Sequence, residues 1–493
     1  MKVLFLNPLK FTERFNISTN LINAYISTPS LTFAQLASYI PGKEITVIDG
    51  QVEDISPGEF LRKLSGVDVV VISIHSTHAA KNCEANIKII KKYYPRVKII
   101  MGGYHATFFY ERWLSLGVDF VLLYEGERYF GELIECLDKN KDYRGIKNLV
   151  YRDNGKIIVN EIGPLINDLD LIPIPRFDII NFKKYSVFFP GDGYAGGIEL
   201  SRGCSYRCEF CLTGIYWNHC YRRKSNQRIL KELKLLVDMG IKKIWFYTSS
   251  FGIMPEEDYA LCELIEKGGI QINWRAPIRI DTVLKFPRLI EKSAHAGLRS
   301  VLIGYESMLK DAANDAALAE FNKIKDLEYN FNAFKEAYRI LKKNNILVEG
   351  SFIIGYSEKL EKGESLSSIK FNQICDVLII QVYRPNVALL PEMLSNGPES
   401  ADYKRLFYFD ARSSEDFKVR KASLKKLRIQ IKYYFNPFYI FSRFFLKGSL
   451  VRRLYLYYYG HLIKNLCSKF TVTTVNRNNI EFSRLAEKNK NAP

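Results

Sequence analysis

The sequence predicts an α/β protein with two parallel-sheet regions and a helical C-terminal extension. In residues 1–140 and again in residues 195–390, short apolar runs alternate with helical patterns. This alternation is typical of parallel sheets with helices packed on them. The proline-spaced segment Leu171–Phe177 indicates a connector over residues 141–194. We expect the remaining residues, 391–493, to form a helical region that is basic and aromatic.

Size and composition are those of a folded globular protein. The chain has 493 residues, of which 47% are hydrophobic, and a formal net charge of +18. Lys421–Phe470 contains eleven Lys or Arg residues and no acid, so most of the excess charge belongs to the C-terminal region. The apolar run at Met1–Pro8 is too short for a signal peptide, and no run is long enough to span a membrane. With no disulfide framework in the sequence, we expect a reducing, cytoplasmic location.

The first region, residues 1–140, is expected to fold as a doubly wound, Rossmann-like sheet. Apolar runs predict its strands at Lys2–Leu6, Ile45–Ile48, Val67–Ile74, Val97–Met101 and Phe120–Leu123. Helical patterns lie between these strands, at Thr32–Tyr39, Ala79–Tyr94 and Phe130–Leu137. Such sheets bind ligands at the carboxyl ends of their strands. Polar residues and glycines gather at these ends and form the candidate ligand set Asp49, Ser73, His75, Gly102, Gly103, His105, Glu125 and Gly126.

The connector and the second region continue the α/β pattern. Tyr151–Val159 predicts a hairpin on an Asn-Gly turn. Six further strands are expected at Gly197–Ser201, Lys243–Tyr247, Ile272–Ala276, Ser300–Ile303, Val348–Ile354 and Val377–Val382. Helical patterns fill the gaps, for example at Asn226–Met239, Glu256–Lys267 and Phe331–Asn344. In parallel barrels the chemistry lies at the C-terminal ends of the strands.

Three cysteines follow the first of these strands in a C-x3-C-x2-C triplet, Cys204, Cys208 and Cys211. Thiolates select iron–sulfur clusters, zinc or copper(I). A structural zinc site would need a fourth soft ligand, and His219 or Cys220 could supply one. A three-ligand cluster would instead leave one iron open to a substrate or cofactor. The other cysteines are scattered and are expected to be free thiols.

The triplet, with Phe210 before its third cysteine and a strand before its first, resembles the signature loop of the radical S-adenosylmethionine (radical SAM) enzymes. In that family the open iron of a [4Fe-4S] cluster binds the methionine moiety of S-adenosylmethionine (SAM). Reductive cleavage of the sulfonium then gives a 5′-deoxyadenosyl radical. The six β/α units match the partial barrel of this family. The resemblance also implies an external electron donor of the flavodoxin or ferredoxin type.

The ends of the later strands resemble the SAM-binding segments of the family. The resemblance implies SAM contacts from Phe210, Ser249, Ser250, Arg279, Glu306 and Gly355. The chain departs from the usual pattern at two places. Relatives usually carry acidic residues where Ser249 and Ser250 lie, and the Pro-Gly-Glu that usually follows Gly355 is missing. Each polar residue of the set has the alternative of a loop hydrogen bond or a surface charge.

The first region, placed before the cysteine triplet, resembles the cobalamin-binding domain of the B12-dependent radical SAM class. The turns at Gly102–Thr107 and Glu125–Glu127 carry this resemblance, and it implies cobalamin contacts from the candidate ligand set. The chain lacks the Asp-x-His-x-x-Gly segment by which other B12 proteins provide a histidine to cobalt. The resemblance therefore implies cobalamin without an axial histidine, or a domain that has lost the cofactor. His75 and His105 could be hydrogen-bonding loop residues only.

The C-terminal region has three interpretations. Its cations and thirteen aromatic residues between Lys421 and Phe470 suit an anionic membrane surface. They would equally suit a helical cap packed on the barrel, and nucleic acid is less favoured because no RNA-binding module is present.

The hypothesis is a B12-dependent radical SAM methyltransferase acting at an unactivated carbon of a small-molecule or lipid-like substrate. Alternatives are radical cyclisation, rearrangement or oxidation on the same scaffold, or a non-catalytic metal-binding protein.

Overall fold

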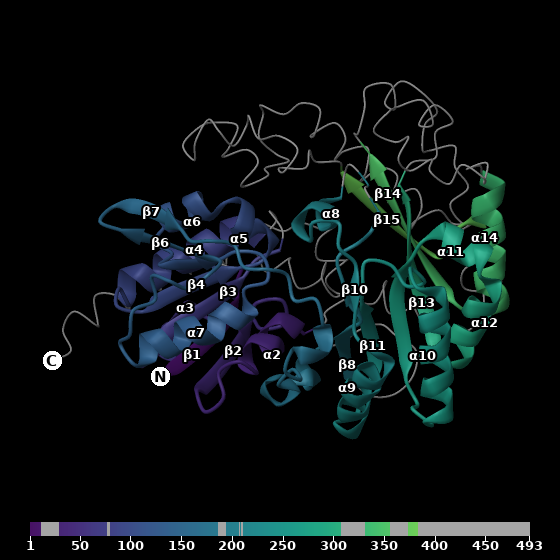
Figure 1. Ribbon diagram of the computed structural model, residues 1–493, viewed down its shortest axis with the longest axis horizontal. Helices are drawn as coiled ribbons and strands as arrows, with labels where there is room; N and C mark the ends of the chain where they lie inside the picture. Colours follow the sequence, from purple (N-terminus) through teal and green to yellow (C-terminus); the bar gives the residue numbers. More distant parts are fainter. Residues whose placement is uncertain are drawn as a thin grey trace, which may run out of the picture.

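The computed structural model describes residues 1–10, 29–75, 79–185, 194–206, 208, 211–306, 331–354 and 373–382. They form two α/β domains that lie side by side (Figure 1). The prediction of two parallel-sheet regions is therefore confirmed. The expected helical region at 391–493 lies outside the described residues. Within the described part of the chain, no helix is long and apolar enough to cross a membrane.

The first domain is a seven-stranded sheet with the order β2-β1-β3-β4-β5-β6-β7. Its parallel strands are β1 (Lys2–Asn7), β2 (Glu44–Asp49), β3 (Val69–Ser73), β4 (Lys98–Gly102) and β5 (Phe120–Leu122). Helices α3 (Pro57–Leu64), α4 (Ala80–Tyr93), α5 (Tyr104–Phe108) and α6 (Tyr110–Ser115) contribute to the core on one face. Helices α2 (Leu31–Ala37) and α7 (Glu127–Asp138) pack on the other face. The strands read as apolar runs because helices bury both faces of the sheet.

The hairpin expected in the connector belongs to the first sheet. Its strands, β6 (Leu149–Asp153) and β7 (Lys156–Val159), extend the sheet antiparallel from β5. Pairing with β6 covers a strand edge that would otherwise be left open. The sheet thus reaches beyond residue 140, where the sequence analysis ended the first domain.

The second domain is a six-stranded parallel sheet with the order β15-β14-β13-β12-β11-β8. Its strands are β8 (Tyr194–Glu199), β11 (Ile241–Tyr247), β12 (Asn273–Ile278), β13 (Leu298–Glu306), β14 (Leu347–Ile354) and β15 (Val377–Val382). Because β8 and β15 are the two ends of this order, the described strands form an open, partial barrel.

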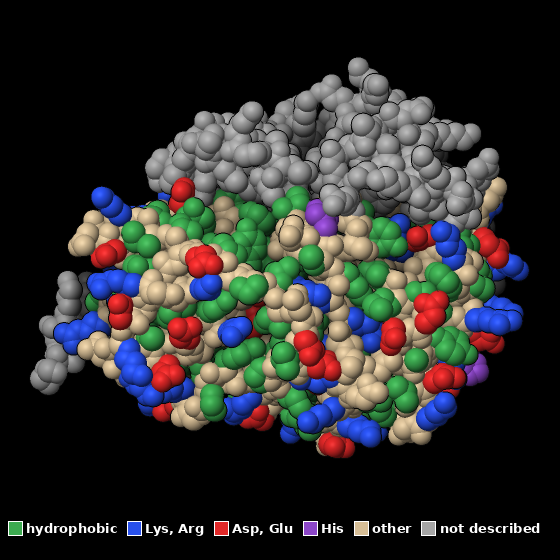
Figure 2. Space-filling model, in the orientation of Figure 1, with side chains coloured by type: hydrophobic (Ala, Val, Ile, Leu, Met, Phe, Trp, Pro, Cys, Tyr) green, Lys and Arg blue, Asp and Glu red, His purple; other side chains and the backbone are tan. Residues whose placement is uncertain are grey.

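Helices cover one face of this second sheet and form its apolar core. They are α9 (Asn226–Asp238), α10 (Pro255–Lys267), α11 (Ile280–Lys285), α12 (Pro287–His295) and α14 (Phe331–Lys343). Helix α9 begins where the Ser225 side chain accepts a hydrogen bond from the Arg228 N–H, a typical N-cap. In Figure 2 basic and acidic side chains are interspersed over the described surface of both domains.

Two short elements connect the second sheet to its cysteine loop. Strand β9 (Ser201–Arg202) follows β8 and pairs antiparallel with β10 (Arg222–Arg223). The cysteine triplet and helix α8 (Leu212–Tyr216) lie between these two strands in the sequence. As a result, the triplet follows the C-terminal end of β8, where the sequence predicted it.

Candidate cofactor site between the two domains

A cavity of about 670 Å³ lies between the two domains. The first domain contributes the C-terminal ends of β1, β3 and β4 and the starts of α2 and α7. The second domain contributes the ends of β8 and β11, strand β9 and helix α8. The carboxyl ends of both parallel sheets therefore face one space, which is where ligands bind in such folds.

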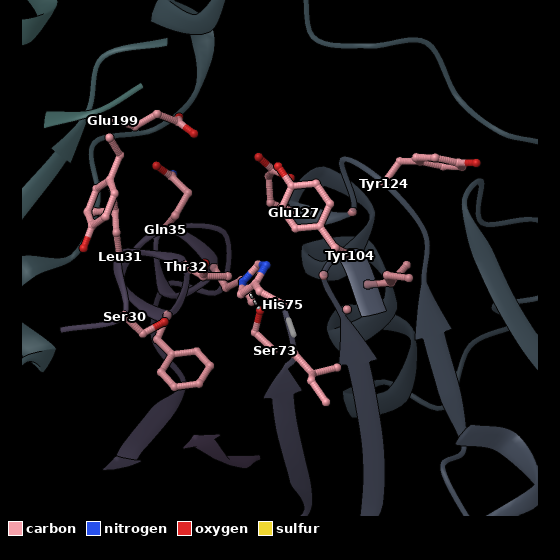
Figure 3. A pocket seen from close by; sticks show the side chains of 18 of the residues that line it. Ser30, Leu31, Thr32, Gln35, Ser73, His75, Tyr104, Tyr124, Glu127 and Glu199 are labelled. Carbon is pink, nitrogen blue, oxygen red and sulfur yellow. Dashed lines mark hydrogen bonds between the residues drawn. The ribbon is translucent and has the colours of Figure 1, made fainter. Parts of the chain in front are cut away.

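Five of the eight residues in the first-domain ligand set line this cavity: Ser73, His75, Gly102, Gly103 and Gly126. The Ser73 hydroxyl lies 2.9 Å from Nε2 of His75, and the His75 ring meets the edge of the Tyr104 ring. Figure 3 shows Ser73 and His75 at the end of β3, with Glu199 to one side of them and Tyr124 to the other. The wall is thus polar at the end of β3.

The backbone turn at the end of β4 requires one of the two glycines. Gly103 has a φ of 95°, and a Cβ there would lie 2.6 Å from the carbonyl oxygen of Ile74. A Cβ on Gly102 would come no closer than 3.5 Å, to the carbonyl oxygen of Leu122. Gly103 therefore lets β4 turn into α5 against the end of β3, whereas Gly102 has room for a methyl group.

We expect Gly103→Ala to lower the free energy of unfolding by about 1–3 kcal/mol, because the substitution forces backbone strain and a clash. Gly102→Ala is the matched control at the neighbouring position. It should change stability by less than about 1 kcal/mol. Urea unfolding of the full-length chain measures both effects. Equal losses for the two variants would contradict this account of the turn.

The other three residues of the set lie outside the cavity lining. The Asp49 carboxylate accepts hydrogen bonds from the Tyr185 hydroxyl at 2.7 Å and from the Asn7 amide at 2.8 Å. Nδ1 of the buried His105 accepts a hydrogen bond from the Trp113 indole at 3.2 Å. Glu125 forms ion pairs with two arginines of the second domain. All three side chains thus form hydrogen bonds or ion pairs with other residues of the protein.

The two domains meet at a buried ion cluster that the sequence analysis missed. We call Arg202, Arg222, Glu125, Glu127 and Glu199 the seam cluster. Arg202 Nη1 lies 2.9 Å from Oε1 of Glu125 and also pairs with Glu127. The Nε atom of Arg202 lies 2.9 Å from Oε1 of Glu199. Arg222 Nη1 lies 2.9 Å from both carboxylate oxygens of Glu125. Arg202, Glu127 and Glu199 also line the cavity.

Aromatic side chains reinforce this contact between the domains. The Trp217 indole donates a hydrogen bond to the Tyr104 hydroxyl at 2.9 Å. The Tyr216 hydroxyl donates to the carbonyl oxygen of Tyr124 at 2.8 Å, and its ring packs on Tyr104. Helix α8, directly after the cysteine triplet, is thereby fixed to the first domain.

The three cysteines of the triplet are partly buried, whereas Cys220 is exposed and its thiol donates to the carbonyl oxygen of Asn218. Burial raises the pKa of the Cys204 thiol, and the nearby Arg279 opposes that rise. Among the described side chains, no three His, Cys, Asp or Glu residues converge on a point that would hold a single metal ion. A cluster has several irons, so its thiolates need not converge on one point. Thiolates on one loop are the ligands by which proteins hold iron–sulfur clusters.

Two of the predicted SAM contacts lie next to the cysteine loop. Ser249 lines the cavity and its hydroxyl donates to the carbonyl oxygen of Gly203, the residue before Cys204. The Arg279 guanidinium lies 3.8 Å from the centre of the Tyr206 ring, within the loop, and pairs with Asp281. Both side chains therefore contact the loop that carries the cysteine triplet.

Of the other four predicted SAM contacts, only Ser250 has a side chain that the structure describes. Ser250 is buried outside the cavity lining, and its hydroxyl donates to the carbonyl oxygen of Phe251. Glu306 is the last residue of β13, at the edge of the sheet where the parallel strands end, but the structure does not describe its side chain. Phe210 and Gly355 lie outside the described residues.

The comparisons with known proteins agree with this arrangement. A family model described as "B12 binding domain" matches residues 17–134, and one described as "Radical SAM superfamily" matches residues 198–366. An uncharacterised methyltransferase of Pyrococcus horikoshii is 30% identical over 71% of this chain and 74% of its own length. The anaerobic magnesium-protoporphyrin IX monomethyl ester cyclase of Rubrivivax gelatinosus is 26% identical over 72% of this chain, which spans 62% of that protein.

A solved structure shares the fold. The radical SAM methyltransferase TsrM from Kitasatospora setae, with tryptophan and a SAM analogue bound, superposes with a TM-score of 0.59 at 14% identity. The match covers 80% of this chain and 76% of TsrM. Two domain families in this order, a relative at 30% identity and the shared fold show that the chain belongs to the B12-binding radical SAM enzymes, whose cofactors are a [4Fe-4S] cluster, SAM and cobalamin.

Proposed function

We propose that this chain is a cobalamin-dependent radical SAM methyltransferase that methylates an unactivated carbon of a small molecule. The proposal rests mainly on the shared cavity, because its lining includes both the ends of β3 and β4 and Gly203 and helix α8, which flank the cysteine triplet. A methyl donor bound in the first domain would then lie next to a radical generator bound in the second. The name of the relative from Pyrococcus horikoshii, a methyltransferase, supports the same reaction class.

The cavity wall fits cobalamin. The corrin ring carries amide side chains, which both donate and accept hydrogen bonds. Carboxylates of Glu127 and Glu199 would accept from such amides, and the Ser73 hydroxyl and the His75 ring would serve the same amides at the end of β3. Gly102, Gly103 and Gly126 present backbone without side chains along the same wall. Asp49, His105 and Glu125 would support this wall from behind through their partners.

The second domain would hold the other two cofactors. Cys204, Cys208 and Cys211 would ligate the cluster. Arg279 suits a carboxylate such as that of SAM, and Ser249 would accept from its amino group. By resemblance, Phe210, Ser250, Glu306 and Gly355 complete the SAM site. When bound, these groups supply the radical and methyl-transfer chemistry, while the residues of the chain bind them, orient them and exclude water.

Cyclisation is the second candidate function, because the relative from Rubrivivax gelatinosus is a cyclase. The two reactions differ in their products, since methylation adds one carbon to the substrate and ring closure adds none.

Full-length protein, purified and reconstituted without oxygen, tests the proposal. We expect the iron and sulfide of one [4Fe-4S] cluster and about one cobalamin for each chain after incubation with hydroxocobalamin. Iron, sulfide and corrin analysis, together with absorbance spectra, measures this outcome. Well-folded protein that retains the cluster but no corrin would exclude cobalamin-dependent methylation and leave the other radical reactions.

Partners and location follow from the same proposal. A flavodoxin or ferredoxin would deliver the electron that reductive cleavage of SAM requires. An oxygen-sensitive cluster favours the cytoplasm. Attachment to an anionic membrane face would come from the basic segment between Lys421 and Phe470, which lies outside the described residues. We propose no nucleic-acid partner.

A further inference from the structure

The seam cluster joins the cavity wall to the start of the cysteine loop through one side chain. Arg202 lies two residues before Cys204 and is 6% exposed. Its guanidinium contacts Glu127, the first residue of α7, and Glu199, the last residue of β8. Both carboxylates line the cavity. A ligand that contacts Glu127 or Glu199 therefore changes the surroundings of Arg202 directly.

The backbone after Arg202 has little freedom to move independently. Gly203 has a φ of 78°, and a Cβ there would lie 1.8 Å from the carbonyl oxygen of Cys220. Its own carbonyl oxygen accepts a hydrogen bond from Ser249. If Arg202 moves, either Cys204 moves with it or these contacts of Gly203 hold the backbone in place.

The charges of the seam cluster favour a shift of Arg202 when a ligand binds. Arg202 and Arg222 lie directly opposite each other on β9 and β10, where like charges repel. Glu125 separates them by pairing with both. Counting Glu127 and Glu199, three carboxylates face two guanidinium groups. The two carboxylates on the cavity wall compete for Arg202, so a ligand that donates hydrogen bonds to one of them shifts Arg202 toward the other.

We propose that Arg202 is a positioning residue that couples cobalamin binding in the cavity to the placement of the cysteine loop. This inference rests on the cobalamin-dependent function proposed above. Coupling between two binding sites is reciprocal, so the loaded cluster must change the affinity for cobalamin by the same factor as cobalamin changes the affinity for the cluster.

The test compares the dissociation constant of hydroxocobalamin for the full-length chain with and without its cluster, by anaerobic equilibrium dialysis. We expect cobalamin to bind about fivefold or more tightly to the cluster-loaded protein. In Arg202→Met this ratio should fall to about one, because the methionine keeps the bulk and loses the charge. Glu127→Gln should lower the ratio as well, since it removes the negative charge of one of the two carboxylates that pair with Arg202 on the cavity wall.

Arg222→Met is the matched control. Arg222 is buried to the same degree as Arg202 and contacts the same Glu125, but it is absent from the cavity lining and from the start of the cysteine loop. The control should lose stability and retain the ratio. A loss of general packing would lower the ratio in both arginine variants and would overturn the inference.

Three further outcomes are decisive. A ratio of one in the unaltered protein, or an unchanged ratio in folded Arg202→Met, rejects the coupling through Arg202 while leaving cobalamin binding in place. If Arg202→Met does not fold, Glu127→Gln alone decides. No binding of hydroxocobalamin by either form of the unaltered protein rejects the proposed function, and the coupling with it.

Discussion

Replacing any one of Cys204, Cys208 and Cys211 by alanine is expected to abolish the reductive cleavage of SAM. With two thiolates left on the loop, a second iron of the cluster has no protein ligand, and the described side chains contain no group of three His, Cys, Asp or Glu that could hold a metal ion instead. The measurements are iron content after anaerobic reconstitution and formation of 5′-deoxyadenosine with a chemical reductant. We expect both to fall to background in each of the three variants.

Cys220→Ala is the matched control for these variants. Cys220 is exposed, and its contact with Gly203 is made by its backbone carbonyl oxygen, which alanine retains. Iron content and cleavage of SAM should therefore match those of the unaltered chain. Loss of iron in Cys220→Ala alone would show that Cys220 is a ligand and that one member of the triplet is not.

The strands of the two sheets were predictable because a short run of apolar residues in the sequence indicates each of them. A buried parallel strand such as β3 is apolar at successive positions, since helices cover both of its faces. All the expected strands of both sheets are present, with shifts of a few residues at their ends. The position of the hairpin was harder to predict. Its turn is a local feature, but its pairing with β5 depends on an open sheet edge that no short segment reveals.

The site residues also differ in whether a local sequence pattern predicts them. The glycine turn after β4 and the cysteine triplet are set by spacing within a few residues. The role of Glu125 is not set by local spacing, because its partner Arg202 lies 77 residues further along the chain. An acidic residue at the end of a strand is equally suited to a ligand or to a buried ion pair. The arginine directly before Gly203-Cys204 was the one signal that could have indicated the seam cluster.

Within the second domain, a buried ion pair joins two strands of the partial barrel. Arg275 on β12 lies 2.5 Å from Glu349 on β14, and these residues are 3% and 1% exposed. The other carboxylate oxygen of Glu349 accepts a hydrogen bond from Ser300 on β13, which lies between them. The Arg275 guanidinium also packs over the Trp245 ring at 3.8 Å. The pair therefore spans three adjacent interior strands, β12, β13 and β14.

Glu349→Leu should lower the free energy of unfolding by about 3–5 kcal/mol, because it leaves the Arg275 guanidinium buried without a counter-charge. Arg275→Met should cost a similar amount by leaving the carboxylate unpaired. The double variant Arg275→Met/Glu349→Leu should recover most of the loss, since two apolar side chains replace both charges and no buried charge remains. Urea unfolding of all three variants measures the effect. If the losses of the single variants simply add in the double variant, the two side chains do not stabilise the barrel as a pair, and packing rather than charge accounts for their burial.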